Sequence, residues 1–223
     1  MIIKIAFPRR MDIEIFGEPM RLFPQKAVLL KKEKALLIAD LHLGKINHFR
    51  KSGIAVPSKA NDHNLELLME VVSLARPQRI ICLGDLFHSH YNTEWEVFGE
   101  VVKHYAGITF ELVLGNHDIM SEHQYERKGI HVYDDLVLGP FLFTHHPVEE
   151  ELPDGQYNIA GHIHPGVHLV GKGRQSVVLP CFYFGARQAY LPAFGKFTGL
   201  ARIAPRKEDK VFVVADNKVM SVS

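Results

Sequence analysis

The first third of the chain alternates short apolar runs with polar residues and then changes to a helical period. Strands are expected over residues 12–23 and 27–30, and the run ALLIA at 35–39 is apolar throughout, which is typical of a strand buried on both faces. The next segment has the i, i+3, i+4, i+7 spacing of a helix with one buried face, formed by Leu65, Leu68, Met69 and Val72. Ser58 is expected to cap this helix, and Pro77 ends it before a strand at 80–83.

A second strand–helix–strand unit follows the first. Thr93 and Glu96 have the spacing of a capping box at the start of a helix. The buried stripe of that helix is expected to be Trp95, Phe98, Val102 and Tyr105. The run at 108–114 then predicts the next strand, so the first half of the chain is read as α/β.

From about residue 131 the pattern contains only short apolar runs separated by Gly, Pro or Asp-Asn turns, with no long helical stretch. The second half is therefore expected to be mostly β. With 223 residues and 47% hydrophobic residues, the chain is long enough for one sizeable core, and it contains no repeat or linker. We expect one domain over residues 1–223.

Polar residues follow the predicted strands at their C-terminal ends. Asp40 and His42 follow the run at 35–39, and Gly84-Asp85 follows the next strand. Further along come the blocks Gly115-Asn116-His117-Asp118, His145, and Gly161-His162-Ile163-His164. Because ligand sites of open α/β sheets collect beyond these strand ends, the first four blocks are expected to converge on one crevice. The last block follows His145 by only 17 positions, which is too short for a helical crossover, so it is assigned to a turn in the β region.

The converging side chains predict a metal centre. Carboxylate, amide and imidazole donors suit first-row metals that keep open positions for water and substrate, whereas a structural zinc site would favour cysteine. Seven donors exceed one site and indicate two ions that share a carboxylate. Two dications less two aspartates leave a local charge of about +2, which favours a phosphate ester. The predicted reaction is attack of a metal-activated hydroxide on phosphorus.

Charge and composition narrow the setting. The formal charge of +1 gives no overall field toward polyanions, and the 14 histidines are the one unusual count. Cys82 and Cys181 lie in apolar runs far apart, which is typical of buried thiols in a reducing compartment. The opening residues lack a cleavage site, and no run reaches 18 apolar residues. A cytoplasmic protein with no membrane segment is expected.

The blocks D-x-H, G-D, G-N-H-D, H and G-H-x-H, in this order, resemble the calcineurin-like metallophosphoesterase superfamily. The resemblance implies a four-layer α/β/β/α sandwich of two mixed β-sheets flanked by helices. It assigns one metal to Asp40, His42 and His164, the other to Asn116, His145 and His162, and the bridge to Asp85. His145 is selected over His146 because the family ligand precedes x-Pro. His117 would protonate the leaving oxygen or steady the phosphoryl charge, with Asp118 as its partner.

The branch of the superfamily is indicated by smaller motifs. The block GDLFHS differs from that of protein phosphatases and is similar to that of double-strand-break repair nucleases, where the histidine lies beside the substrate phosphate, which assigns that role to His88. With ADLHLGK, Phe49-Arg50, Glu94-Trp95 and LPAFGKFTG, the chain is most similar to the bacterial ligase-associated DNA damage response endonucleases. That resemblance implies manganese-dependent cleavage of single-stranded DNA in repair. It also implies a functional association with a DNA ligase, a helicase and a second nuclease.

The sequence is also compatible with other functions, metals and residue roles. The chain is alternatively a phosphoesterase of nucleotides or other small phosphodiesters, or a non-catalytic protein-binding scaffold like one subunit of the retromer complex. Iron and zinc suit the same ligands as manganese. Among Lys45, Arg50 and Lys51, Arg50 is the preferred contact to DNA, although such a cluster is more often a solvated face. His63, His90, His123 and His146 are more often surface or packed residues. The aromatic run at 181–197 could stack bases, but a β core explains it more often.

Overall fold

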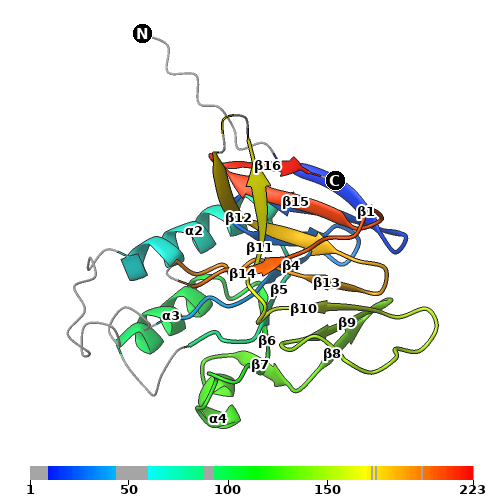
Figure 1. Ribbon diagram of the computed structural model, residues 1–223. Coiled ribbons are helices and arrows are strands. Elements are labelled where there is room, and N and C mark those ends of the chain that lie inside the picture. The colour runs from blue at the N-terminus through cyan, green and yellow to red at the C-terminus, as the bar shows by residue number, and fades with distance from the viewer. Residues whose placement is uncertain are drawn as a thin grey trace.

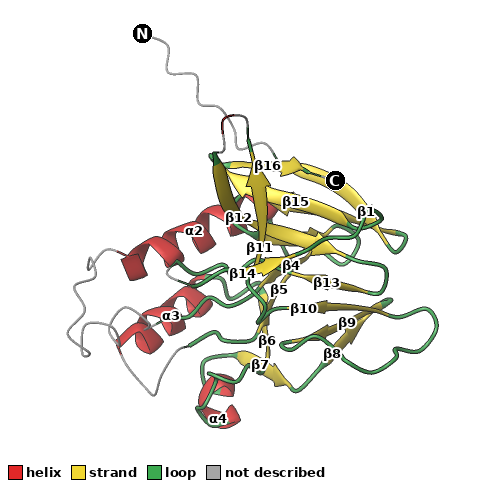
Figure 2. Ribbon diagram, viewed as in Figure 1, coloured by secondary structure: helices red, strands yellow, loops and turns green. Residues whose placement is uncertain are grey.

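Two β-sheets packed face to face form the body of the protein, and helices lie against one of them (Figures 1 and 2). The computed structural model describes residues 10–43, 60–87, 93–171, 173, 175–196 and 198–222. Both sheets mix parallel and antiparallel pairs. The predicted sandwich of two mixed sheets is therefore confirmed, whereas the described helices cover only one of its outer faces and not both, as the four-layer α/β/β/α arrangement expects.

The first sheet contains seven strands of the described chain in sequence order. They are β1 (Met11–Ile15), β2 (Glu18–Phe23), β3 (Ala27–Leu30), β4 (Ala35–Ile38), β5 (Arg79–Leu83), β6 (Thr109–Val113) and β7 (Ile130–Tyr133). Pairing is antiparallel from β1 to β4 and parallel from β4 to β7. The β1–β2 hairpin turns at Phe16 and Gly17, which both have positive φ (52° and 77°), as a two-residue hairpin turn requires.

The second sheet contains nine strands of the described residues, with β14-β11-β12-β13-β10-β9-β8 as its main order. The strand β15 pairs with β12 and with β16. Their bounds are β8 (Leu136–Leu138), β9 (Phe141–Thr144), β10 (Tyr157–Ala160), β11 (Pro165–Val170), β12 (Ser176–Phe184), β13 (Gln188–Tyr190), β14 (Ala201–Ile203), β15 (Lys210–Ala215) and β16 (Lys218–Ser221). The second half of the chain is thus β, as its turn-rich pattern predicts.

The helices of the described residues are α2 (Ala60–Ala75), α3 (Thr93–His104) and α4 (Glu122–Glu126). All three pack against the same face of the first sheet (Figure 2). The expected stripe of α2 is confirmed except at Met69, which is 42% exposed, because Val71 takes the buried place. Ser58 lies outside the described residues, and α4 is too short for a periodic signal. Within the described ranges, no helix combines the length and the apolar composition that crossing a membrane needs.

The two cores explain the uniformly apolar strands. On β5, Ile80 and Cys82 face the core under the helices, whereas Ile81 and Leu83 face the core between the two sheets. The strand β4 divides its side chains in the same way. Both strands are therefore buried on both faces, as the run at 35–39 predicts.

The connection from β9 to β10 differs from the expectation. The two strands pair in parallel, with Phe141 opposite Tyr157 and Thr144 opposite Ala160. A loop without a helix makes this crossover. His162 and His164 lie, as expected, in a connection within the β region, between β10 and β11. What the spacing did not predict is the parallel pairing of β9 and β10, through which this block follows a parallel strand end just as the earlier blocks do.

Phe182, which is fully buried between the sheets, tests this packing. We expect Phe182→Ala to lower the free energy of unfolding by about 3–5 kcal/mol, because a large cavity would remain in a core shared by both sheets. Denaturant unfolding in the presence of a chelator measures this. The control Val137→Ala, at a residue 55% exposed on β8, is expected to change it by no more than about 0.5 kcal/mol. A decrease of less than about 1 kcal/mol in the free energy of unfolding for Phe182→Ala would contradict the placement of Phe182 in the core between the sheets.

Candidate metal centre

The predicted strand ends meet at one edge of the sandwich, where the two sheets join. The backbone N–H of Asp40 donates to the carbonyl of Gly84 (3.2 Å), and that of His42 donates to the carbonyl of Asp85 (2.9 Å). The N–H of His162, from the second sheet, donates to Oδ2 of Asp40 (3.0 Å). These bonds connect the ends of β4, β5 and β10, so blocks from both sheets share one site.

A first group of donors lies around the carboxylate of Asp40. Asp40, His42 and His164 place one ligand atom each within 4.8 Å of the others. Nε2 of His164 is 3.2 Å from Oδ1 of Asp40, and Nε2 of His42 is 3.5 Å from Oδ2 of Asp85. These residues are the ones that the resemblance assigns to one metal.

A second group surrounds Nε2 of His145. This atom lies 3.1 Å from Oδ1 of Asn116 and 3.2 Å from Nδ1 of His162. Oδ1 of Asp85 is 3.5 Å away. On the other side of the ring, Nδ1 of His145 is 3.0 Å from the carbonyl of Leu83. A carbonyl only accepts, so a neutral His145 carries its proton on Nδ1 and turns the Nε2 lone pair toward the second group.

Asp85 joins the two groups. Its Oδ1 faces His145 and its Oδ2 faces His42. The carboxylate is 3% exposed, and Oδ1 also accepts a hydrogen bond from the backbone N–H of His117 (2.9 Å). This is the arrangement that a bridging ligand between two ions requires.

The donor set fits two divalent cations by three observations. Asp40 and Asp85 are both buried, and the ion pairs of these carboxylates within the described ranges are to histidines, with no lysine or arginine. Nε2 of His164 is buried and makes no hydrogen bond, although Oδ1 of Asp40 lies 3.2 Å away. Donor separations of 3.1–3.5 Å are close to the roughly 3.0 Å between neighbouring ligands bound at about 2.1 Å. Buried carboxylates need such a cation, because isolated burial of charge is costly.

The backbone is strained where the donors lie. Residues other than glycine with positive φ are uncommon, and such strain gathers at functional sites. Here the conformation occurs at five of the predicted ligands, namely Asp40, His42, Asp85, His162 and His164. The left-handed conformation turns the chain sharply after each strand and directs the side chains into one space.

Two glycines leave room for the donors. A Cβ at Gly84 would lie 2.1 Å from Nδ1 of His145, and Gly84 also has a φ of +76°. A Cβ at Gly115 would lie 2.3 Å from the backbone N and 2.4 Å from Oδ1 of Asp85. The Gly that precedes Asp85 and the Gly that precedes Asn116 are thus required by close approach between loops.

His117 and Asp118 lie beside this centre in different surroundings. The His117 side chain is 41% exposed, and its Nε2 is 4.0 Å from Oδ2 of Asp85. The buried Asp118 carboxylate accepts hydrogen bonds from the N–H groups of Gly115 (2.9 Å) and Phe87 (3.2 Å) and from the Tyr125 hydroxyl (3.4 Å). Burial raises the pKa of Asp118 to about 6, against the opposing effect of these amides. Asp118 therefore holds two loops together, and its pairing with His117 stays a prediction.

The surroundings of His162 shift its imidazole toward the neutral form. Partial burial lowers its pKa, and the adjacent rings of His146 and His145 lower it further. A neutral imidazole is the form that binds a metal.

The segment Ala193–Lys196 supports the first donor group from behind. The N–H groups of Phe194 and Gly195 donate to the carbonyls of Ala39 (2.7 Å) and Asp40 (3.1 Å). Lys26 Nζ donates to the carbonyl of Ala193 (2.8 Å). Buried Asn64 donates to the carbonyl of Leu41 (3.4 Å) and accepts from the Lys196 N–H (3.3 Å). Sequence reasoning missed Lys26 and Asn64, since neither lies near a motif.

Several residues singled out in the sequence lie outside the described ranges, and two others lie on helices. Arg50 and His88 lie outside the described residues, as do Lys45, Lys51 and His90. His63 on α2 is half-buried and His123 on α4 is exposed, and each lies near a glutamate one turn away, as expected of residues at the surface.

The aromatic run of the second sheet is mainly core. Phe182, Phe184 and Phe194 are buried, which confirms for them the interpretation as β core rather than as a surface that stacks bases. The rings of Tyr183 and Tyr190 stack with their centroids 5.1 Å apart, and both residues line an open cavity of about 660 Å³. Five acidic residues and two arginines also line it: Glu149, Glu150, Glu151, Glu208, Asp209, Arg187 and Arg206. This excess of negative charge disfavours a nucleic-acid strand there.

The fold and the donor groups together define a metal-dependent hydrolase of the metallophosphoesterase class. A family model, calcineurin-like phosphoesterase, matches residues 34–173. The chain belongs to this family, since the match covers more than half of it and contains all the donor blocks. No curated protein matches the chain.

Among solved structures, the chain is similar to the nuclease MPE of Pseudomonas putida, with a TM-score of 0.80 and 28% identity over 96% of this chain and 100% of that chain. Two further matches share 13% identity. The phosphoesterase Yfce of E. coli has a TM-score of 0.41 over 82% of this chain and 88% of that one. Vps29 of Entamoeba histolytica has 0.34 over 84% and 96%. Scores this low support no argument.

Gly115→Ala is expected to disrupt the metal centre, because the added Cβ would displace Asp85 from its place between the two donor groups. Metal analysis after gel filtration should show the loss of bound ions, with most of the free energy of unfolding kept. The matched control is Gly107→Ala, since a Cβ at Gly107 meets nothing within 4 Å. Full metal content in Gly115→Ala would contradict the bridging position of Asp85.

The buried amine of Lys26 gives a prediction on pH. Burial, and the nearby charge of Lys196, lower the pKa of Lys26 from 10.5 to about 8. At pH values between about 8 and 10.5, Lys26 is protonated in the unfolded chain and largely neutral in the folded one. The unfolded chain therefore binds more protons, so the contribution of Lys26 to the free energy of unfolding rises with pH in this range and is lost as the pH falls through about 8. The stability of the natural protein relative to Lys26→Met should thus rise above pH 8, by at most about 1.4 kcal/mol per pH unit. Urea unfolding of both proteins at several pH values measures it, and a flat or falling difference would contradict the burial.

Proposed function

We propose that this protein is a manganese-dependent endonuclease that cleaves single-stranded DNA in DNA repair. The observation that carries the proposal is the similarity to the nuclease MPE over 96% of this chain, combined with a donor set for two ions at the junction of the sheets. A similarity that extends over the whole chain supports a shared substrate class better than a similarity confined to the core of the fold would. The smaller alternatives, a nucleotide or another small phosphodiester, become outcomes of the experiment below.

In this proposal Asp40, His42 and His164 would hold one ion, Asn116, His145 and His162 would hold the other, and Asp85 would be shared between them. Two bound dications would acidify a coordinated water and polarise the phosphoryl oxygens. The chain's own contribution is to supply the donors that would hold these ions next to each other. Two dications less the charges of Asp40 and Asp85 give about +2, which attracts a phosphodiester anion.

His117 is proposed to act on the leaving oxygen. Its imidazole is partly exposed, and its ring centroid is 5.5 Å from that of His42. Its backbone N–H is tied to Asp85, so the ring is held at the rim of the centre without being one of the donors. From there it can deliver a proton to the oxygen that departs from phosphorus. His88 and Arg50 are proposed as contacts to the DNA phosphates on their motifs alone.

Manganese is proposed over zinc and iron for the first donor group in particular. Carboxylate oxygens suit manganese, whereas the affinity order of divalent metals would favour zinc at any nitrogen-rich site. Metal supply in the cell then decides the occupancy. Association with a DNA ligase, a helicase and a second nuclease stays a prediction from the resemblance.

A substrate panel tests the function. The protein, freed of metal and reloaded separately with manganese, iron or zinc, would receive a labelled single-stranded oligonucleotide, its duplex, a set of nucleotides and an aryl phosphodiester. We expect cleavage of the single strand at internal positions with manganese. Cleavage of the aryl diester with no cleavage of DNA would reject the nuclease, and no hydrolysis of any substrate would reject the proposal as a whole.

His117→Ala tests the mechanism. We expect it to bind both ions and to lose about 100- to 10,000-fold in turnover, the usual contribution of a positioned acid or base. The control His123→Ala removes an exposed histidine of α4 and should leave turnover unchanged. Metal loss in His117→Ala would show that the residue is a ligand, against its assigned role.

A further inference from the structure

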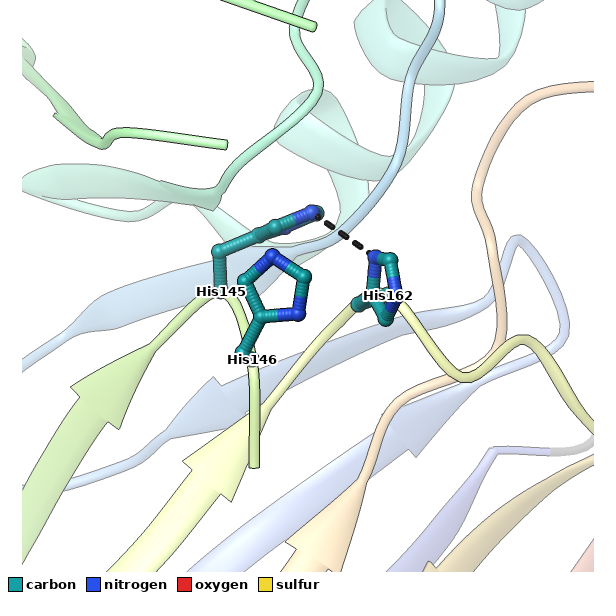
Figure 3. Close-up of side chains that lie close together, drawn as sticks. All are labelled: His145, His146 and His162. Carbon is teal, nitrogen blue, oxygen red and sulfur yellow. Dashed lines mark hydrogen bonds between the residues drawn. The ribbon is translucent and has the colours of Figure 1, made fainter. Parts of the chain in front are cut away.

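A third imidazole lies beside the second donor group and has no role in the family pattern. His146 follows His145 at the end of β9, and its ring centroid is 4.0 Å from that of His162 and 4.8 Å from that of His145. One ring nitrogen from each of the three histidines lies within 4.8 Å of the others. Figure 3 shows the three rings gathered in one space, with the rings from β9 turned toward His162. His146 is exposed, so it lies on the solvent side of the group.

The local chain is built to place His146 there. Consecutive side chains on a strand point to opposite faces, so His145 and His146 would diverge if β9 continued. The Thr144 hydroxyl instead donates to the carbonyl of His146 (2.6 Å), which turns the chain. Thr144 in turn accepts from the amide of Asn158 (2.9 Å), which is fully buried.

Asn158 closes the same loop on its other side. Its Oδ1 accepts a hydrogen bond from the N–H of Val148 (3.2 Å), and its Nδ2 also donates to the carbonyl of Leu142 (3.0 Å). Buried polar groups of this kind fix one conformation, because each lost hydrogen bond is costly away from water. The backbone on both sides of His146 is therefore held by one buried network.

We propose that His146 is a third imidazole ligand of the second ion, next to His145 and His162. The proposal rests on the two-metal centre proposed above and adds to it a residue outside the family's ligand set. The ring lies on the side of the second group that faces solvent, next to His162 and His145. One imidazole more at this ion leaves one position fewer for water and substrate.

The two ions would then have unequal surroundings. The first would have the carboxylates of Asp40 and Asp85 with two imidazoles, whereas the second would have the shared carboxylate, one amide oxygen and three imidazoles. Imidazole suits cobalt, nickel and zinc better than manganese, which prefers oxygen ligands. His146 would thus increase the preference of the second site for these metals and leave the first site unaffected.

Metal binding by the full chain tests this without reference to activity. Metal-free natural protein and His146→Ala would be titrated with manganese and with cobalt, following heat and the visible absorption of bound cobalt. We expect two ions in both proteins, with affinity at the second site at least tenfold weaker in His146→Ala, since loss of even an indirect partner costs about 10- to 100-fold. The loss should be larger for cobalt than for manganese. The control His131→Ala, at an exposed histidine of β7, should match the natural protein.

Two variants of Thr144 test the positioning of His146. Thr144→Val removes the hydroxyl that holds the His146 carbonyl and should weaken the second site in the same direction as His146→Ala. Thr144→Ser keeps the hydroxyl and should restore the affinity. Unfolding of each variant in chelator shows whether it is folded, and the Ser variant keeps the test decisive if the Val variant is not.

The outcomes separate this proposal from the one it rests on. Unchanged affinity of both sites in His146→Ala overturns the ligand role, and a higher KM with unchanged metal binding assigns His146 to the substrate instead. Loss of both ions in that variant also overturns it, because the first group does not include His146. A natural protein that binds no ion would reject the two-metal centre itself.

Discussion

The arrangement of this structure around its candidate site depends on the charge of two carboxylates buried at the junction of two sheets. Asp40 and Asp85 are almost inaccessible to water, and the basic side chains that contact them in the described chain are histidines, with no lysine or arginine. Such an arrangement needs positive charge at its centre, because neither the low dielectric of the interior nor neutral imidazoles compensate two anions. The histidines, the amide of Asn116 and the left-handed loops around the carboxylates all follow from the need to surround cations at fixed positions.

The sandwich places these groups because parallel strands end at a common edge. The strands β4, β5 and β6 deliver their donors from one sheet, and β9 and β10 deliver theirs from the other. Bonds such as that from the His162 N–H to Asp40 then tie the two sheets together at the site itself. The apolar core between the sheets therefore supports the strands whose ends carry the donors.

A further layer of residues keeps the donors in position without being donors. Asp118 binds two loops through their amides, and the segment Ala193–Lys196 holds the backbone of Asp40 from the opposite side. The network of Asn158 and Thr144 does the same for the end of β9. Strained backbone conformations persist only when the surroundings determine them, and these contacts supply that determination.

The sequence by itself determined the order of the elements and pointed to the candidate donors that the structure brings together. Local periodicity and strand-end blocks depend on short-range spacing, so the strands at 35–39 and 80–83, the two long helices and the donors from Asp40 to His164 were readable from it. It failed where spacing is ambiguous: at Met69, whose place in the helix stripe is taken by Val71, and between β9 and β10, where a loop without a helix makes a parallel crossover. Only the tertiary structure decided which atoms of Asp85 face which group, that Lys26 and Asn64 support the site, and that His146 joins His162. These depend on contacts between residues far apart in the chain, which no local pattern records.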